Sequence, residues 1–331
     1  MKKFINSPDF LVPEALEGLG AAYPEWLRVD TRLQIVTRAG PPRPGKVGVL
    51  SGGGSGHEPM HSGFVGRGML DAACCGQVFT SPATGSIISA TRAVDAGAGV
   101  LYVIKNYTGD IMNFGIAAEA ARGHGSEVES VIVADDVALG DVPTGRRGTG
   151  ATMLVQKIAG AQAERGAPLG RVADTARRAS ERSGSFGVAL TSCVNPVLGR
   201  PTISHDEDEM EVGIGIHGEP GRRQALVKPA ASIVEEMATA IIDDMRPPRG
   251  AEVLAFVNGL GGTPLIELYL VYGELERLLA ARGLRPVRRI VGNYVTSLDT
   301  AGLSISLLLL DEELMTLWDD PVLTPGLRWK A

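Results

Sequence analysis

Short apolar runs alternate with segments of helical period along the first half of the chain. Val47 to Leu50, Val100 to Ile104 and Val128 to Val133 are almost continuously apolar, which is typical of strands buried on both faces. A further strand is expected at residues 33–36, and helices are expected at 11–27, 114–121, 151–164 and 172–182. This alternation predicts an α/β fold with a doubly wound, mostly parallel sheet and helices on both of its faces.

The pattern changes after Ser183-Gly184-Ser185, which we interpret as a domain junction. Beyond it, strands are predicted at 186–190, 212–216, 253–257, 289–291 and 303–310, and helices at 230–245 and 264–281. Thr263 is expected to cap the second of these helices, with Pro264 at its first position. We therefore predict two domains: a doubly wound α/β domain over residues 1–184 and a smaller, mixed α+β domain over residues 185–331.

Composition narrows the class of protein. The 331 residues carry a net charge of −6 without a basic stripe, which argues against a nucleic-acid partner. No apolar run approaches the roughly 18 residues that a membrane-spanning helix needs, and the first residues lack the apolar core of a signal peptide. The three cysteines, Cys74, Cys75 and Cys193, do not suggest a disulfide framework, so we expect a reducing, cytoplasmic compartment. Cys74 is expected to be a small buried hydrophobe.

The segment from Leu50 to Pro59 is the most unusual in the chain, because residues 52–56 include four glycines. Glycine lets the backbone turn sharply and lets a ligand approach main-chain N–H groups. We therefore predict a turn that follows a strand, feeds a helix and binds a small polar or anionic ligand. The segment is neither a Walker loop nor a Gly-x-Gly-x-x-Gly turn. It ends instead in His57, a side chain that can take part in chemistry.

Two other segments carry candidate chemistry. Lys105 and Asp110 directly follow a predicted strand, and ligands bind outside the carboxyl ends of parallel strands. Both side chains would come within reach of His57 if the two strands are neighbours. His217 ends a run in which glycine alternates with β-branched residues, and Glu219-Pro220 follows it much as Glu58-Pro59 follows His57. The two histidines are therefore expected to face one site.

Other polar clusters favour simpler interpretations. His57 and His61 are four residues apart in a Gly-rich turn, which is poor geometry for a zinc pair, and no metal site is predicted. The acidic run at 206–209 is interpreted as a solvated turn rather than a cation site. Arg146 and Arg147 stand between glycines just before a predicted helix, where they fit either a phosphate or local carboxylates.

These motifs together resemble the substrate-binding K subunit of the dihydroxyacetone kinase family, from Lys2 to Trp329. The motifs that carry the resemblance are Ser51 to His61, Phe79 to Pro82, Ile104 to Asp110, Gly145 to Gly148, Gly213 to Gly221 and Ser297 to Asp299. The resemblance implies that His217 forms a covalent hemiaminal with the ketone carbon of dihydroxyacetone. It also implies that His57 and Asp110 bind the substrate hydroxyls, with Asp110 as the better candidate for the base.

The same resemblance assigns further substrate contacts. Backbone N–H groups of Gly54, Ser55 and Gly56 are expected to face the substrate, and Lys105 is expected to hold a hydroxyl or the developing phosphate. The family also implies a homodimer and a separate, helical L subunit that carries Mg-ADP or Mg-ATP. The chain itself is therefore expected to bind no cofactor.

Two departures from the family pattern leave alternatives open. Residues 83–86 and the short loop 221–228, with Arg222 and Arg223, differ from what the family leads us to expect. The substrate is therefore dihydroxyacetone or a larger ketose such as erythrulose, and the donor is ATP or the phosphotransferase system. A second class of function is a ketose-sensing paralogue that acts with a transcription factor. Such a paralogue would be expected to lack a site residue, and all four site residues with reactive side chains are present, which favours the kinase.

Overall fold

The computed structural model describes residues 2–140, 145–201, 203 and 206–330. A first sheet of six strands occupies the first half of this part of the chain, in the order β1-β2-β4-β3-β5-β6. The neighbours β4, β3, β5 and β6 run parallel, and β1 and β2 add an antiparallel edge. The strands are β1 (Leu27–Asp30), β2 (Ile35–Arg38), β3 (Gly48–Ser55), β4 (Ala72–Val78), β5 (Val100–Lys105) and β6 (Val128–Val133).

Helices cover both faces of this sheet, so the doubly wound architecture is confirmed. On one face lie α2 (Thr84–Val94) and α3 (Thr108–Gly123), and on the other lie α4 (Ala151–Glu164) and α5 (Leu169–Glu181). The helix α1 (Leu11–Ala22) packs beside β1 and β4, and short 3-10 turns stand at Pro8–Phe10 and Ser62–Phe64. The sequence pattern did not predict α2.

The second sheet is mainly antiparallel, in the order β11-β10-β12-β7-β8-β9. Only the pair β10 and β11 is parallel among the described strands of this sheet. Its strands are β7 (Ser183–Ala189), β8 (Glu209–Val212), β9 (Arg223–Leu226), β10 (Glu252–Gly259), β11 (Arg285–Gly292) and β12 (Gly302–Leu309). The remaining elements are α6 (Ala230–Met245), α7 (Leu265–Ala281), α8 (Glu312–Asp319), β13 (Val322–Leu323) and β14 (Arg328–Trp329).

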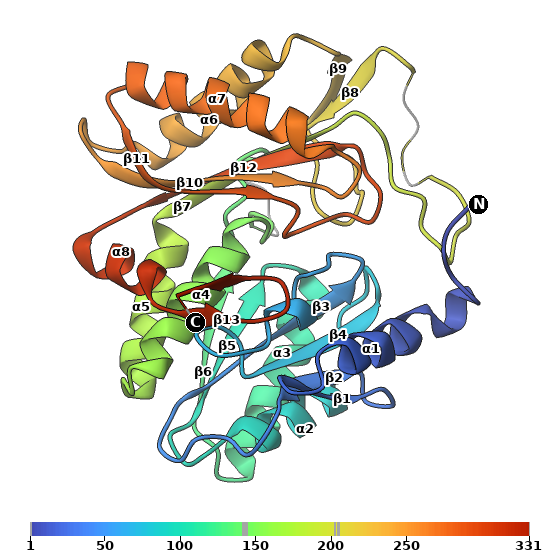
Figure 1. Ribbon diagram of the computed structural model, residues 1–331, viewed down its shortest axis with the longest axis vertical. Helices are drawn as coiled ribbons and strands as arrows, with labels where there is room; N and C mark the ends of the chain where they lie inside the picture. The colour runs from blue at the N-terminus through green and yellow to red at the C-terminus, as the bar shows by residue number, and fades with distance from the viewer. Residues whose placement is uncertain (1, 141–144, 202, 204–205, 331) are drawn as a thin grey trace.

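The elements stack in layers (Figure 1). Helices α6 and α7 cover the outer face of the second sheet, and α4 lies between the two sheets and packs on both. Since α4 is buried on nearly every side, its apolar residues are not confined to one stripe. Val49 of the first sheet, Leu154 of α4 and Phe256 of the second sheet belong to one apolar core. The division into domains at residue 184 stays a prediction.

Three local predictions are wrong. The glycine run forms the second half of β3 rather than a turn, and a 3-10 turn rather than a helix comes next. Strand β8 ends at Val212, so residues 213–216 lie outside it. The Thr263 hydroxyl does not cap α7: it donates to Gly302 O (2.7 Å), and Pro264 takes the cap position.

Candidate functional site

The candidate site lies where the strand order of the first sheet reverses. From β3 the chain continues to β4 on one side and later to β5 on the other, and such a reversal opens a crevice at the carboxyl ends of the strands. A cavity of about 400 Å³ occupies this place. It is lined by Gly54, Phe79, Ser81, Tyr107, Thr108, Gly109, Asp110, His217 and Glu219.

The glycines of β3 make room for the groups beneath and beside this cavity. A Cβ on Gly53 would lie 2.0 Å from the ammonium nitrogen of Lys105. A Cβ on Gly54 would lie 2.6 Å from the backbone of Phe79. Position 54 therefore requires glycine because a side chain would meet backbone, and a side chain at position 53 would displace the Lys105 ammonium group.

Lys105 is fully buried at the end of β5 and does not line the cavity. Its ammonium group donates to three acceptors: Gly52 O (3.2 Å), His61 Nε2 (3.0 Å) and Asp110 Oδ2 (3.1 Å). An ammonium group has three protons, so these partners use its full capacity. Lys105 therefore holds the Asp110 carboxylate from the buried side, away from the cavity.

His61 completes this buried network. Its Nε2 accepts from Lys105, and its Nδ1 lies 3.2 Å from the Ser51 hydroxyl and 2.8 Å from the side-chain nitrogen of Gln156. Burial lowers the pKa of His61 well below its ordinary value, and the positive charge of Lys105 lowers it further. A neutral His61 can act as the acceptor that Lys105 requires.

His57 lies against His217, and one of its ring nitrogens has no hydrogen-bond partner among the described residues. Its Nδ1 donates to Thr296 O (2.7 Å), which leaves Nε2 as an acceptor. Nε2 is buried and has no hydrogen-bond partner within the described residues. Burial lowers the pKa of His57 well below its usual range, and the neighbouring His217 and Lys105 add to this effect. The ring stacks on Phe79 with centroids 5.1 Å apart.

His217 reaches the cavity from the loop that follows β8. Its ring meets His57, Phe79 and Tyr107 edge-on, with centroids 4.8, 5.5 and 4.3 Å apart respectively. Burial lowers the pKa of His217 to about 3, and the positive charges of Lys105 and Arg147 also lower it. The imidazole is therefore neutral, with a nucleophilic lone pair, throughout the physiological pH range.

A buried ion-pair cluster braces the loop that carries His217. Arg147 donates to Asp136 Oδ2 (2.7 Å), Gly213 O (2.6 Å) and Glu219 Oε1 (3.4 Å). Glu219 in turn accepts from the backbone N–H of His217 (2.8 Å). Burial raises the pKa of Asp136 to about 6, although Arg147 opposes that rise. Arg147 thus pairs with carboxylates inside the fold.

Arg146 differs from its neighbour, because it forms a bidentate pair with Asp244 of α6 (2.7 and 2.5 Å) at the surface. Of the two interpretations left open for these arginines, the structure supports local carboxylates for both.

The comparisons with known proteins agree with the sequence motifs. The Dak1 domain matches residues 17–326. The chain belongs to the Dak1 family. The resemblance to dihydroxyacetone kinase K subunits is therefore confirmed.

Two curated bacterial relatives match this Dak1 chain over nearly its whole length. The dihydroxyacetone-binding subunit DhaK of the PEP-dependent dihydroxyacetone kinase of Escherichia coli is 42% identical and is covered, like this chain, to 99%. A DhaK subunit of a PTS-dependent dihydroxyacetone kinase of Listeria innocua is 43% identical, with 95% of each chain covered.

Solved structures match the fold as closely. The dihydroxyacetone kinase of C. freundii superposes with a TM-score of 0.87 at 36% identity, over 99% of this chain and 60% of that one. The dihydroxyacetone kinase operon co-activator Dha-DhaQ superposes with a TM-score of 0.89 at 33% identity, over 95% of this chain and 97% of that one.

The structure of this Dak1 chain brings most of the predicted site residues together. Gly54, Asp110 and His217 line one cavity, and the His57 ring contacts that of His217. Lys105 lies beneath the cavity rather than in its wall.

Ser55 and Gly56 line a different cavity, beside α1. The Ser55 hydroxyl donates to Gly76 O (2.7 Å) and so ties β3 to β4.

Several residues of the site were not singled out as site residues from the sequence. They are His61, Phe79, Tyr107, Arg147 in its buried role, and Glu219. Phe79, Tyr107 and Glu219 do lie in segments that the sequence marks by glycine or histidine, so their position beside those motifs was a usable signal.

Among the described residues, no group of three or more His, Cys, Asp or Glu side chains is placed to hold a metal ion. In the same part of the chain no helix is both long and apolar enough to cross a membrane. The three cysteines are free and buried, as expected for Cys74.

Proposed function

We propose that this chain is the substrate-binding subunit of a dihydroxyacetone-type kinase, which is a phosphotransferase acting on an alcohol group. One observation carries the proposal: a neutral imidazole, His217, lines the same small cavity as a buried carboxylate, Asp110. A carbonyl compound with an adjacent hydroxyl meets a nucleophile and a base there. The full-length similarity to two DhaK subunits supports the same conclusion.

We further propose that His217 anchors the ketose as a hemiaminal. An imidazole nitrogen adds its lone pair to the ketone carbon, and a C–N bond forms while the carbonyl π electrons move to oxygen. The proton that the ring loses ends on that oxygen, so the adduct is neutral overall. Since the pKa of His217 is about 3, the nucleophilic form is present without any cost of deprotonation at neutral pH.

Asp110 is proposed as the general base. It stands in the first turn of α3, where the helix dipole favours a negative charge, and Lys105 holds its Oδ2 at 3.1 Å. The carboxylate accepts the proton of the substrate hydroxyl while that oxygen attacks phosphorus and the bond to the donor breaks. His57 Nε2, which has no hydrogen-bond partner among the described residues, is proposed to accept a hydrogen bond from a second substrate hydroxyl.

The phosphoryl donor is proposed to be held by a partner. An L-type subunit carrying Mg-ADP or Mg-ATP would supply the phosphoryl group, and the chain itself would act as a cytoplasmic homodimer. The two bacterial relatives belong to a PEP-dependent and a PTS-dependent kinase, which favours a donor fed by the phosphotransferase system over ATP. The ketose is dihydroxyacetone or a close relative such as erythrulose.

The structural match to the co-activator Dha-DhaQ supports the second candidate, a ketose sensor that acts with a transcription factor. The two candidates share ketose binding and differ in phosphoryl transfer. His57, Lys105, Asp110 and His217 form one connected constellation here, which a sensor does not need in full.

The test has two stages. First, intact mass and crystallography with dihydroxyacetone should detect an adduct on His217, and His217→Ala should bind far more weakly while keeping its melting temperature. Second, wild type with a cognate L subunit should phosphorylate dihydroxyacetone, whereas the chain alone with ATP and Mg²⁺ should not. Failure of every L subunit to support transfer, with ketose binding intact, would establish the sensor instead.

A further inference from the structure

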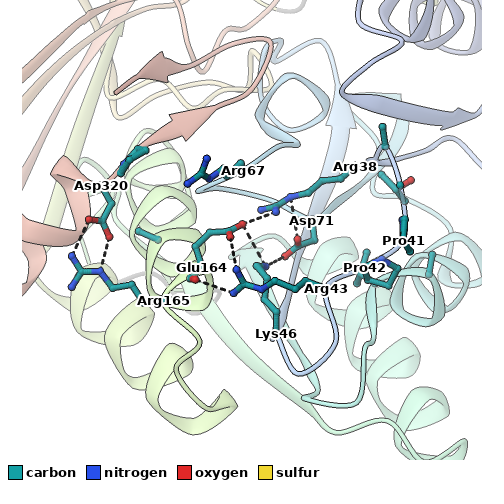
Figure 2. A pocket seen from close by; sticks show the side chains of 17 residues that line it. Arg38, Pro41, Pro42, Arg43, Lys46, Arg67, Asp71, Glu164, Arg165 and Asp320 are labelled. Carbon is teal, nitrogen blue, oxygen red and sulfur yellow. Dashed lines mark hydrogen bonds and ion pairs between the residues drawn. The ribbon is translucent and has the colours of Figure 1, made fainter. Parts of the chain in front are cut away.

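A charged cavity of about 600 Å³ lies at the amino ends of β3 and β4, whereas the ketose site lies at the carboxyl ends of the parallel strands. Figure 2 shows its walls: the end of β2 with the loop at Pro41 and Pro42, the residue Lys46 just before β3, and the end of α4. Arg67, from the connection between β3 and β4, completes it. None of the residues proposed to handle the ketose lines this cavity.

Three cations of the cavity share two carboxylates. Lys46 Nζ lies 2.6 Å from Asp71 Oδ2, and Arg38 Nε lies 3.1 Å from Asp71 Oδ1. Arg38 also pairs with Glu164 (2.5 Å), and so does Arg43 at 3.6 Å. Lys46 is almost fully buried, and burial lowers its pKa. Although burial alone would raise the pKa of Glu164, Arg38 and Lys46 hold it below its usual value.

Arg67 is a fourth cation, and within the described residues no carboxylate pairs with its guanidinium group. The backbone on both sides of it is fixed. Gly66 and Gly68 have φ values of +155° and +79°, and a Cβ on either would lie about 2 Å from the carbonyl oxygen of Leu323 or Pro321. Leu323 N–H also donates to Arg67 O (2.9 Å). A rigid, glycine-flanked segment therefore presents an unpaired guanidinium group at the cavity.

The charges of the cavity do not balance. Arg165 and Asp320 form a bidentate pair (2.7 and 2.8 Å) and cancel each other. The other four cations face two carboxylates, which leaves two positive charges. In addition, Arg38 Nη2 is buried and has no partner among the described residues.

The ion pairs also tie the end of α4 to the sheet, and this structural role accounts for Lys46, Asp71 and Glu164. It does not account for Arg67 or for Arg38 Nη2. Arg38 Nη2 is buried, and a buried donor without a partner is costly unless an acceptor completes it. Arg67 is exposed and adds a guanidinium group that no carboxylate of the described residues neutralises. The volume is also in the range of small-molecule sites.

We propose that this cavity binds a soluble metabolite that carries a phosphate monoester, with Arg67 as a principal ligand of the phosphate. A phosphate monoester carries about −1.5 to −2 charges at pH 7, which matches the excess of the cavity. The planar guanidinium fork pairs with two phosphate oxygens at once. Because this site shares no residue with the ketose cavity, the proposal stands independently of the proposed function.

The test is isothermal titration calorimetry at low ionic strength, with inorganic phosphate and glycerol 3-phosphate as probes and glycerol as the neutral control. Both phosphates should bind the wild type, the ester more tightly, and glycerol should not bind here. Arg67→Ala should weaken binding at least tenfold, and Arg43→Ala should also weaken it. Arg277→Ala is the matched control: it removes an exposed arginine of α7 and should leave affinity within twofold.

Arg67 is exposed, and among the described residues no hydrogen bond or ion pair holds its side chain, so its alanine variant should melt within a few degrees of wild type. Two results would overturn the proposal: no binding of either phosphate at about 10 mM, which would detect millimolar dissociation constants, or equal affinity in wild type and Arg67→Ala. A third result would also overturn it: glycerol 3-phosphate does not bind, but the chain co-sediments with phosphatidate vesicles and Arg67→Ala does not. That outcome would assign the phosphate to a lipid rather than to a soluble metabolite.

Discussion

Acidification should barely affect ketose binding at His217, although histidine chemistry usually fails below pH 6. An ordinary histidine has a pKa near 6.5, so at pH 5 roughly 3% of it would be neutral and able to add to a ketone. Burial and the charges of Lys105 and Arg147 lower the pKa of His217 to about 3, so about 99% remains neutral at pH 5. The expected change in affinity between pH 8 and pH 5 is therefore less than about twofold, compared with roughly thirtyfold for an ordinary histidine.

The assay is a titration with dihydroxyacetone labelled with carbon-13 at the ketone carbon, followed by NMR at several pH values. Formation of the hemiaminal converts that carbon from trigonal to tetrahedral, which separates the bound signal from the free one. Asp136 is the group near the site whose pKa, about 6, lies within the range examined. A shallow change near pH 6 that Asp136→Asn removes would therefore belong to that residue.

The control for this experiment is His217→Ala, which should give no tetrahedral signal at any pH. Circular dichroism at each pH confirms that the chain is folded. A tenfold loss of affinity per pH unit below pH 6.5, in folded protein, would refute the reasoning, because it would show that His217 titrates like a solvated histidine.

The buried histidines, Gly53 and Arg147 each give a further prediction. The free energy of unfolding should fall as pH decreases below 6.5, because His57, His61 and His217 stay neutral in the folded chain and take up protons on unfolding. The three together contribute up to about 4 kcal/mol per pH unit. A urea titration series that is flat from pH 7 to 5, or a slope that disappears in the control His124→Asn, would contradict this. Gly53→Ala should abolish ketose binding measurable by calorimetry and destabilise the fold by about 1–3 kcal/mol, since the new Cβ would lie 2.0 Å from Lys105 Nζ. The control Gly18→Ala should bind normally, because the space around its new Cβ is open to 4 Å. Arg147→Met should destabilise the fold by about 3 kcal/mol and weaken ketose binding at least tenfold, because Asp136 and the loop of His217 lose their ion-pair and hydrogen-bond partner. The matched control is Arg146→Met, which breaks a surface pair with Asp244. Equal effects of the two variants would be evidence against this role of Arg147.

Much of the fold could be predicted from the sequence because its buried elements carry uninterrupted apolar patterns. Strand β6 and helices α4 and α6 begin and end where the pattern predicts. The two unpredicted helices are α2 and α8. Helix α2 begins with Thr84-Gly85-Ser86, which lacks the usual helix-forming residues, and α8 has only eight residues. Their stability comes from packing on elements that are distant in sequence, which a local pattern does not contain.

The candidate site was predictable where a reactive side chain follows a strand. His57, Asp110 and His217 were selected on that basis. In the structure Asp110 and His217 line one cavity, and the His57 ring contacts that of His217. The aromatic residues Phe79 and Tyr107 could not be assigned from the sequence in the same way. Both rings contact His217, and the three residues lie in three different connections of the fold, after β4, β5 and β8.

The glycine run shows why a correct site can be reached through a wrong local structure. Glycines in a ligand-binding turn and glycines in a crowded strand have the same sequence signature, because both permit close approach. Here the group that approaches Gly53 is the protein's own Lys105, and not a ligand. Only the pairing of β3 with β5 places that ammonium nitrogen beside the strand, and that pairing joins segments about 50 residues apart.

This arrangement gives the glycines an indirect part in the proposed chemistry. The Lys105 ammonium is fully buried, so its protons require acceptors, and it finds them in Gly52 O, His61 Nε2 and the Asp110 carboxylate. That geometry exists only if position 53 has no side chain. The glycine therefore makes room for the lysine, and the lysine fixes the proposed base. The need for glycine at position 53 therefore comes from the orientation of the Asp110 carboxylate on α3. This constraint becomes visible only when β3 and β5 are placed side by side.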